Sequence, residues 1–210
     1  MVNIRRLLCM GDSMTDISMN FPSGTAVQAK NEAPILTHPR GDRSLHWSDL
    51  LARELKCEMV NTGVGGYQTT QLLSKMQEMI FQYNPSHVLL NIGSNDLAPW
   101  NNNDYKQTMD RLRNIVSQIV GKGIVCYLWT CSCNFSQSYP QEKISILDKY
   151  EKELNDVAKQ YGCQHVSIWD YAWGKVPARL KNADALHNTG EGNFLIAKKL
   201  YDFITSLDAR

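Results

Sequence analysis

The stretch "RLLCMGDSMTD", residues 6–16, joins a short apolar run to a polar turn. An apolar run of this length that ends at a glycine is typical of a buried strand followed by a tight turn. The turn leaves Ser13 immediately beyond the strand, and Asp12 can accept hydrogen bonds from the turn amides. The stretch therefore predicts an accessible serine at the carboxyl end of a buried strand. A Ser-Thr turn that caps a helix is the alternative.

Short apolar runs of the same kind alternate with longer stretches of helical period along the whole chain. Five such runs are predicted to be strands: residues 6–10, 58–61, 87–92, 124–130 and 164–168. Five stretches are predicted to be helices: after a cap at Ser44, after a cap at Thr70, from Asp104, over residues 142–161 and after Thr189. The alternation predicts one α/β domain over residues 1–210, with a parallel sheet covered on both faces. Reactive groups in such sheets gather at the carboxyl ends of the strands.

Composition and charge exclude several classes of protein. The 22 Lys and Arg residues against 21 Asp and Glu residues leave a formal charge of +1 without a basic run, so nucleic acid is not an expected partner. No apolar run approaches the ~20 residues that span a bilayer, and the apolar stretch near the N-terminus is short for a signal peptide. We therefore expect a cytoplasmic protein, with secretion open if a leader is removed. Six cysteines in mostly apolar settings, with neither CxxC nor HExxH, predict reduced core thiols and no metal or other cofactor.

Two further predicted strands end in loops with candidate ligand-binding groups. The loop "NTGVGGYQTT", residues 61–70, has three glycines whose backbone amides can approach a ligand closely. It does not match a dinucleotide fingerprint, because Gln68 stands where a third spaced glycine is needed, and a tight turn is the alternative. The loop "NIGSNDL", residues 91–97, offers the side-chain amide of Asn95 as a donor, and Asp96 is placed to hold the loop through backbone amides. An ordinary Asx turn is the alternative for Asn95.

The segment "DALHNTGEG", residues 184–192, places Asp184 three positions before His187, just ahead of the last predicted helix. A turn of this length can bring the carboxylate to one imidazole nitrogen and leave the other nitrogen able to accept a proton. The other four histidines have no Asp or Glu at this offset. A polar turn before a helix cap is the alternative.

These loops would meet at one edge of the predicted sheet, and their groups have complementary roles. Acyl transfer requires a nucleophile, a base, an orienting carboxylate, and donors aimed at the developing oxyanion. Ser13, His187 and Asp184 supply the first three. The backbone N–H of Ser13, a glycine N–H of the second loop and the amide of Asn95 supply the donors.

The four blocks together resemble those of the SGNH, or GDSL, hydrolase family. "GDSMT" is similar to the first block, which implies that Ser13 is the nucleophile, and "DALH" is similar to the last, which implies that Asp184 and His187 complete a catalytic triad. "GSND" is similar to the third block, whose asparagine, Asn95 here, is an oxyanion donor. "NTGVGGYQTT" is similar to the second block, and the resemblance puts its oxyanion glycine at Gly66.

Three departures from the family pattern qualify this correspondence. Gly65 stands where serine or alanine is common, so Gly63 and Gly65 compete with Gly66 for the oxyanion role. Met14 replaces the usual leucine with an apolar residue of similar volume. Residues 17–43 form a long connection that is either a lid, a part of the substrate pocket or a surface loop.

The resemblance also implies a fold and a reaction. Family members have a three-layer α/β/α sandwich whose five-stranded parallel sheet has the flavodoxin-like order 2-1-3-4-5. The implied activity is ester hydrolysis through an acyl-enzyme, and we expect a short acyl group such as acetyl on a small-molecule or carbohydrate carrier, which suits a carbohydrate O-deacetylase. Lysophospholipase, thioesterase and acyltransferase activities remain alternatives. A binding module with a degenerate site is disfavoured because every catalytic residue type is present, and the oligomeric state is not predicted.

Several side chains are candidates for contact with the substrate. Trp100 follows "GSND", and Tyr171 and Trp173 precede "DALH", so we expect these rings to lie at the rim of the cleft. Packing beneath the loops is the alternative for each ring. Asp12 is a further candidate for substrate contact. Three apolar residues can either line an acyl pocket or fill the core: Met14, Met19 and Phe21.

Overall fold

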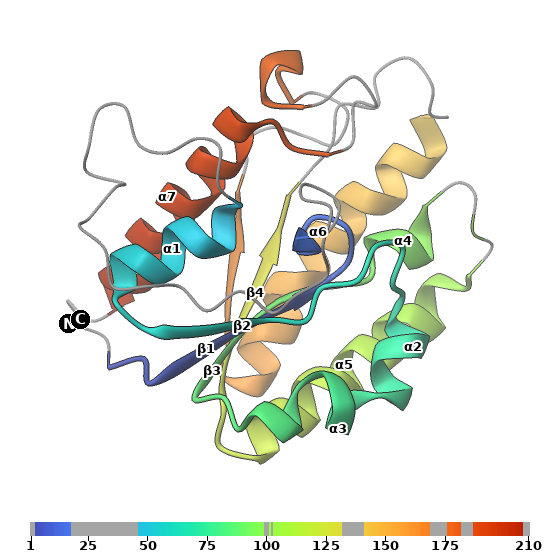
Figure 1. The fold of residues 1–210 in the computed structure, drawn as a ribbon. Coiled ribbons are helices and arrows are strands. Elements are labelled where there is room, and N and C mark those ends of the chain that lie inside the picture. The colour runs from blue at the N-terminus through green and yellow to red at the C-terminus, as the bar shows by residue number, and fades with distance from the viewer. Residues whose placement is uncertain are drawn as a thin grey trace.

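Five parallel strands form the centre of the molecule, in the order β2-β1-β3-β4-β5 (Figure 1). They are β1 (Arg6–Gly11), β2 (Glu58–Asn61), β3 (His87–Asn91), β4 (Val125–Thr130) and β5 (Gln164–Ser167). This computed structural model describes residues 3–17, 46–98, 101, 103–131, 141–168, 176–181 and 187–207. The predicted strands and the strand order implied by the resemblance are confirmed, and each strand end agrees with its prediction to within one residue.

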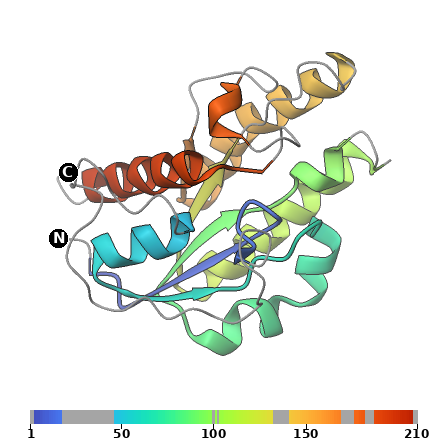
Figure 2. The same cartoon turned by 45° about the horizontal axis from the view of Figure 1, so that its top comes forward.

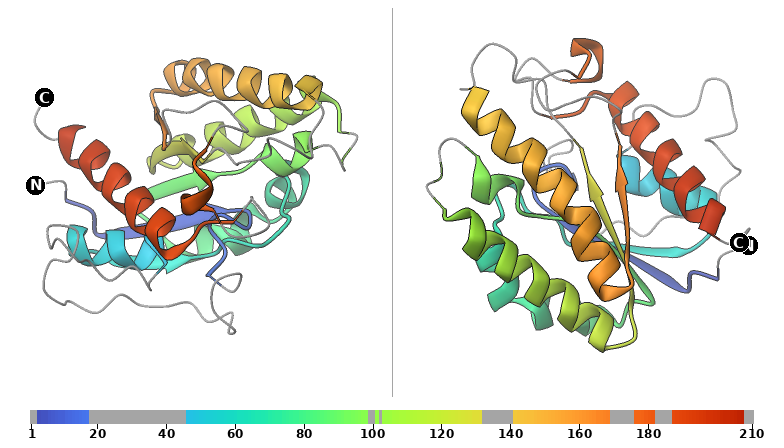
Figure 3. Two further views of the ribbon diagram at one scale, coloured as in Figure 1. Left: turned by 90° about the horizontal axis from the view of Figure 1, so that it is seen from above. Right: turned by 180° about the vertical axis from the view of Figure 1, so that it is seen from behind.

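Helices cover both faces of the sheet. On one face α1 (Trp47–Leu55) packs beside α7 (Gly190–Leu207), as Figure 2 shows. The other face carries α5 (Tyr105–Gly121) and α6 (Gln141–Tyr161), with α2 (Thr69–Ser74) against α5 (Figure 3). The short elements are α3 (Met76–Met79), η2 (Phe81–Tyr83), α4 (Ser94–Leu97) and η3 (Ala178–Leu180). Both faces of the central strands are therefore buried, and in β3 all five residues are buried, including the polar His87 and Asn91 at its ends.

Two predicted helix caps are wrong. The N-cap of α1 is His46, whose ring accepts a hydrogen bond from the backbone N–H of Ser48 at 3.3 Å, and Ser44 lies outside the described residues. The helix predicted after a cap at Thr70 begins two residues earlier, at Thr69, and its N-cap is Gln68, whose backbone N–H donates to the side chain of Gln71 at 2.7 Å. The side chain of Gln71 is long enough to reach back to the free N–H of Gln68. The spacing of residues in the sequence did not reveal this contact.

The predicted cap at Asp104 is confirmed, because its carboxylate accepts from the N–H of Gln107 at 2.8 Å. The helix expected after Thr70 is divided, since the N–H of Lys75 bonds to the carbonyl of Leu72 and ends α2 before α3 starts. The consequence of the whole arrangement is that the loops after β1, β2 and β3 leave the sheet at the same edge.

Candidate active site

Ser13 lies half-buried in a hydrogen-bonded turn directly after β1. The backbone carbonyl of Asp12 accepts from the N–H of Thr15 at 3.0 Å and from the N–H of Asp16 at 2.9 Å, which closes the turn around the serine. Gly11 is required here by close packing, because a Cβ atom would lie 2.3 Å from Oγ1 of Thr15 and 2.5 Å from the carbonyl oxygen of Asn91. The loop that holds Ser13 is therefore packed directly against the end of β3.

Asp12 is only 2% exposed, and the protein itself uses both of its carboxylate oxygens. Oδ1 accepts from the N–H of Met14 at 2.9 Å, and Oδ2 accepts from the hydroxyl of Ser94 at 2.7 Å. Burial raises the pKa of Asp12, while these hydrogen bonds and the nearby imidazole of His187 act in the opposite direction. This environment favours a bracing role, which joins the serine loop to the loop after β3, over the substrate contact expected from the sequence.

The first helix also braces the serine loop. The indole N–H of Trp47 donates to the carbonyl of Met14 at 2.7 Å, and Trp47 is itself packed edge-on against Trp129 of β4. The neighbouring His46 is fully buried, and burial lowers its pKa to about 3, which keeps its imidazole neutral near pH 7. His46 is thus part of the buried packing beside the loop. The backbone is held on both sides of Ser13, because Asp12 bonds to Ser94 and Met14 bonds to Trp47.

The three glycines after β2 differ in what their N–H groups bind. The N–H of Gly63 donates to the side chain of Asn61 at 2.9 Å, and the N–H of Gly65 donates to the carboxylate of Asp16 at 2.7 Å. Gly66 is exposed, has a φ of +74°, and its N–H has no hydrogen bond to any part of the chain that the structure describes. Gly66 therefore presents an unoccupied backbone donor, whereas the other two amides are already engaged.

Asn95 lies beside this glycine loop. Its side-chain amide donates to the carbonyl of Tyr67, the residue after Gly66, at 3.1 Å. The turn that carries it requires Gly93, which has a φ of +112° and whose missing Cβ leaves room for the hydroxyl of Tyr150. The two predicted oxyanion donors, one backbone and one side chain, are thus on adjacent segments.

A buried ion pair fastens these two segments together. Both oxygens of the fully buried Asp96 are used: one accepts from the N–H of Thr69 at 2.9 Å and the other from its hydroxyl at 2.5 Å. Arg111 of α5 bonds to the same threonine hydroxyl at 2.8 Å and pairs with Asp96 at 3.3 Å. The sequence suggested that Asp96 would hold its own loop, but the structure shows that it also holds the start of α2. Arg111 was missed, because nothing in its local sequence marks a contact 15 residues away.

The segment around His187 reaches the serine loop from the other end of the chain. Asn188 is 4% exposed, and its side-chain amide donates to Sδ of Met14 at 3.6 Å. His187 is half-buried, and its imidazole interacts electrostatically with Asp12. The residue after the predicted base therefore contacts the residue after the predicted nucleophile.

Several predicted site residues lie outside the described residues. They are Asp184, Trp100, Tyr171, Trp173, Met19, Phe21 and all but Ile17 of the connection over residues 17–43. Their roles remain predictions. Ser13, Gly66, Asn95 and His187 are described, and all four lie in the loops at the carboxyl edge of the sheet or in the segment that contacts them.

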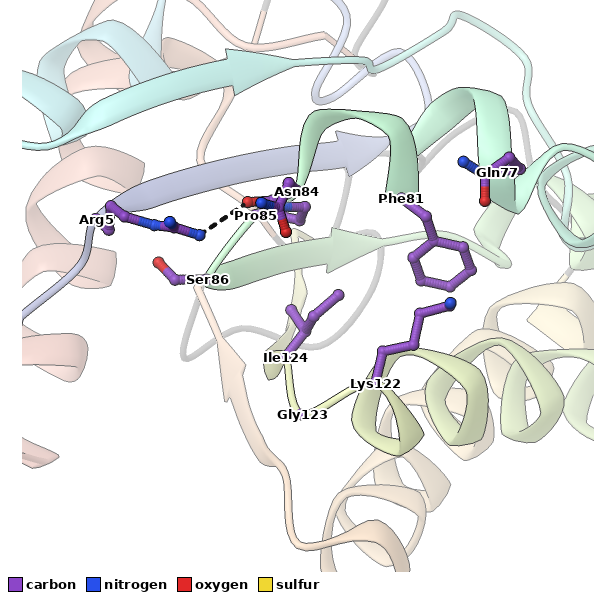
Figure 4. A pocket seen from close by; sticks show the side chains of 9 residues that line it. All are labelled: Arg5, Gln77, Phe81, Asn84, Pro85, Ser86, Lys122, Gly123 and Ile124. Atoms are coloured by element: carbon purple, nitrogen blue, oxygen red, sulfur yellow. Dashed lines mark hydrogen bonds between the residues drawn. The ribbon is translucent and has the colours of Figure 1, made fainter.

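One pocket, with a volume of about 650 Å³, lies elsewhere, and Figure 4 shows the side chains that line it. It opens where β1, β3 and β4 begin, which is the edge of the sheet opposite the serine loop, so it is not part of the candidate active site. Its lining consists of Arg5, Gln77, Phe81, Asn84, Pro85, Ser86, Lys122, Gly123 and Ile124.

Within the described ranges no three His, Cys, Asp or Glu side chains are grouped as metal ligands would be. No helix in that part of the chain combines the length and apolar character that crossing a membrane demands.

Comparison with known proteins identifies the family and the fold. The family model described as the GDSL-like Lipase/Acylhydrolase family matches residues 9–194. No curated protein matches the sequence.

Among solved structures, the acetylxylan esterase Axe2 from Geobacillus stearothermophilus has a TM-score of 0.70 at 17% identity, over 93% of this chain and 92% of that one. Esterase EstA from Pseudoalteromonas sp. has a TM-score of 0.69 at 16% identity, over 98% of this chain and 100% of that one. A G-D-S-L family protein from Desulfitobacterium hafniense DCB-2 has the same TM-score and identity, over 94% of this chain and 98% of that one. At such identities the likeness establishes the shared fold.

Proposed function

The chain belongs to the GDSL-like lipase/acylhydrolase family and is an ester-hydrolysing enzyme, and from this premise we propose that it is a serine esterase for short acyl groups, acetyl above all. The catalytic residues in this proposal are Ser13, His187 and Asp184. One observation carries it furthest: the contact of 3.6 Å between Asn188 and Met14 holds the segment of His187 against the loop of Ser13.

In the proposed mechanism, Oγ of Ser13 attacks the ester carbonyl while the imidazole of His187 accepts the hydroxyl proton. Asp184 orients the imidazole and stabilises the imidazolium that forms. The tetrahedral intermediate collapses to an acyl-enzyme as the imidazolium returns the proton to the departing alcohol. Water then attacks the acyl group with His187 again as the base, and the carboxylic acid is released.

The oxyanion of each tetrahedral intermediate is assigned to the N–H of Ser13, the N–H of Gly66 and the side-chain amide of Asn95. Gly66 is preferred to Gly63 and Gly65 because the other two N–H groups donate to Asn61 and Asp16. The bond from Asn95 to the carbonyl of Tyr67 supports the pairing, since it keeps the side-chain donor next to the backbone donor. Donors fixed in this way need no reorganisation when charge develops on the oxygen.

The acyl group and its carrier are the finer part of the proposal. The acetylxylan esterase activity of Axe2 supports an acetyl group on a carbohydrate, because the two chains share their fold over more than nine-tenths of their length. A carbohydrate O-deacetylase is accordingly the preferred form of the activity. Lysophospholipase, thioesterase and acyltransferase activities would use the same acyl-enzyme.

Hydrolysis of a series of p-nitrophenyl esters from acetyl to palmitoyl, run beside acetylated sugars, tests the proposed acyl group. We expect kcat/KM to be highest for acetyl and to fall with chain length, and we expect acetate to be released from an acetylated xylooligosaccharide. A maximum at long chains would instead favour a lysophospholipase. Product analysis with and without an added alcohol separates hydrolysis from acyl transfer, because only a transferase would give mainly the new ester.

A further inference from the structure

Lys181 is a buried cation beside the candidate active site that the proposed mechanism does not use. It is the residue after η3 and is 4% exposed, although lysine is almost never fully buried in proteins. Burying an ammonium group is costly unless hydrogen bonds replace its lost water. Its contacts therefore indicate what the buried charge does in this fold.

The ammonium group of Lys181 connects two separate parts of the chain. Nζ donates to Oδ1 of Asn188 at 2.7 Å and to Sγ of Cys131, just beyond the end of β4, at 3.5 Å. A charged donor at this distance forms one of the stronger kinds of hydrogen bond. Lys181 thus fastens Asn188 to the carboxyl edge of the sheet.

This bond also sets the orientation of the Asn188 amide. An amide side chain has one oxygen and one nitrogen, which only their hydrogen-bond partners distinguish. Because a cation can only donate, Oδ1 must face Lys181, and the amide nitrogen is then turned toward Sδ of Met14 at 3.6 Å. The cation consequently fixes the contact between the histidine segment and the serine loop.

The backbone strengthens the same connection. Lys181 and Asn188 form an antiparallel bridge, and the N–H of Thr189 donates to the carbonyl of Leu180 at 3.1 Å. Gly192 permits this close approach, because a Cβ atom there would lie 2.4 Å from the same carbonyl oxygen. The peptide on the carboxyl side of His187 is therefore held by side-chain and main-chain bonds together.

We infer that Lys181 is a positioning residue for the proposed reaction: through Asn188 it holds the backbone of His187 at the distance and angle from which the imidazole serves Ser13. The inference rests on the proposed function. It adds Lys181, a residue outside the four family blocks, to the residues on which the proposed reaction depends. In this inference the buried ammonium group positions His187 and does not contact the substrate.

The test compares Lys181→Met, which keeps a side chain of similar length and removes the ammonium, with Lys198→Met as a control. Lys198 is an exposed residue of α7, and its ion pair with Asp202, at 2.7 Å, lies on the surface of that helix. With p-nitrophenyl acetate we expect kcat of Lys181→Met to fall roughly 10- to 100-fold, because small displacements of catalytic groups can cost about that much. KM should stay within about twofold of wild type, since the substrate is not contacted.

A merely structural role would lower the melting temperature and leave kcat per folded molecule unchanged, so both quantities are measured. The double variant with Asn188→Leu is the second test. If Lys181 acts through Asn188, the double variant loses no more activity than the worse single variant. The inference would be overturned if the activity losses of the two single variants multiplied in the double variant. It would also be overturned if Lys181→Met kept the kcat of the wild type.

Lys181→Gln covers the case in which Lys181→Met does not fold. Its amide can still donate to Oδ1 of Asn188, so its kcat should lie between wild type and Asn188→Leu, and a kcat as low as that of Asn188→Leu would contradict the inference. Failure of the proposed function is distinct. In that case the wild-type protein itself would neither hydrolyse the ester nor react with a fluorophosphonate at Ser13.

Discussion

Asn188 donates a hydrogen bond to Sδ of Met14 across 174 positions of sequence, at 3.6 Å. Each residue directly follows a group of the proposed mechanism, His187 in one case and Ser13 in the other. The contact exists because α7 packs beside α1 on one face of the sheet while β1 occupies a central position. The fold thereby brings the loop that holds Ser13 and the segment that holds His187 together at the carboxyl edge of the strands.

Removing the side-chain oxyanion donor should reduce turnover without affecting the binding of substrate. For Asn95→Ala we expect kcat to fall about 10²- to 10³-fold with KM nearly unchanged, which is the usual effect of losing one such donor. Asn103→Ala is the control, because its amide is exposed and, among the described residues, bonds to the side chain of Gln68 at 3.3 Å. Equal kcat values for the two variants would remove Asn95 from the oxyanion site.

The ion pair between Arg111 and Asp96 should matter far more for stability than a surface pair on the same helix. Arg111→Met leaves a fully buried carboxylate without its cation, and we expect a loss of about 3 kcal/mol in the free energy of unfolding. Lys106→Met breaks the exposed pair with Asp110 and should leave the free energy of unfolding almost unchanged, because solvent screens such a pair. Urea titration of both variants checks the difference, and similar midpoints would contradict it.

Asp49 of α1 should make the stability of the protein decrease as the pH rises above 4. Burial raises the pKa of Asp49 from 3.8 to about 6, and its Oδ1 atom is buried without a hydrogen-bond partner among the described residues. The folded state therefore binds this proton more tightly than the unfolded state, and that contribution is present at pH 4 and lost as the pH passes 6.

Asp49→Asn should then be nearly neutral at pH 4 and stabilising at pH 8, by at most about 3 kcal/mol at ~1.4 kcal/mol per pKa unit. Asp110→Asn should change the stability in the opposite direction at pH 8, because Lys106 lowers the pKa of the exposed Asp110. Melting temperatures of both variants at the two pH values give the comparison. A destabilised Asp49→Asn variant at pH 8 would show that the charged form is favoured in the fold.

Cys163 should be alkylated before Cys57, although the two thiols are almost equally buried, at 8% and 7% exposed. A hydrogen bond from the thiol of Cys126 lowers the pKa of Cys163, whereas burial raises the pKa of Cys57 to about 11. Only the thiolate reacts at a useful rate. After treatment with iodoacetamide at pH 8, peptide mapping should show that Cys163 is modified first. Faster labelling of Cys57 would contradict this predicted order.

Much of the fold could be predicted from sequence because buried parallel strands have a simple pattern. The runs that form β1, β2 and β3 end at or near a glycine, whereas those that form β4 and β5 were marked only as short runs rich in Val, Ile, Leu or Cys. The caps were harder, since His46 and Gln68 use side chains that ordinary cap preferences rank below serine and threonine. The family blocks located the loops of the candidate site.

The contacts between those loops could not be predicted in the same way. Ser94 braces Asp12 across 82 positions, and Arg111 reaches Asp96 from a different helix. Such contacts depend on which loops the sheet brings together, and local spacing carries no information about them. Lys181 is the clearest example, because its sequence neighbours give no sign that its side chain is buried.

Covalent labelling of Ser13 tests the central claim most directly. Wild-type protein treated with a fluorophosphonate should gain one adduct, mapped by peptide mass spectrometry to Ser13, and should lose its activity against p-nitrophenyl acetate in proportion. Ser13→Ala should take no label, and His187→Ala should be labelled far more slowly because its serine has no base. Labelling at another residue, or equal rates in wild type and His187→Ala, would contradict the account.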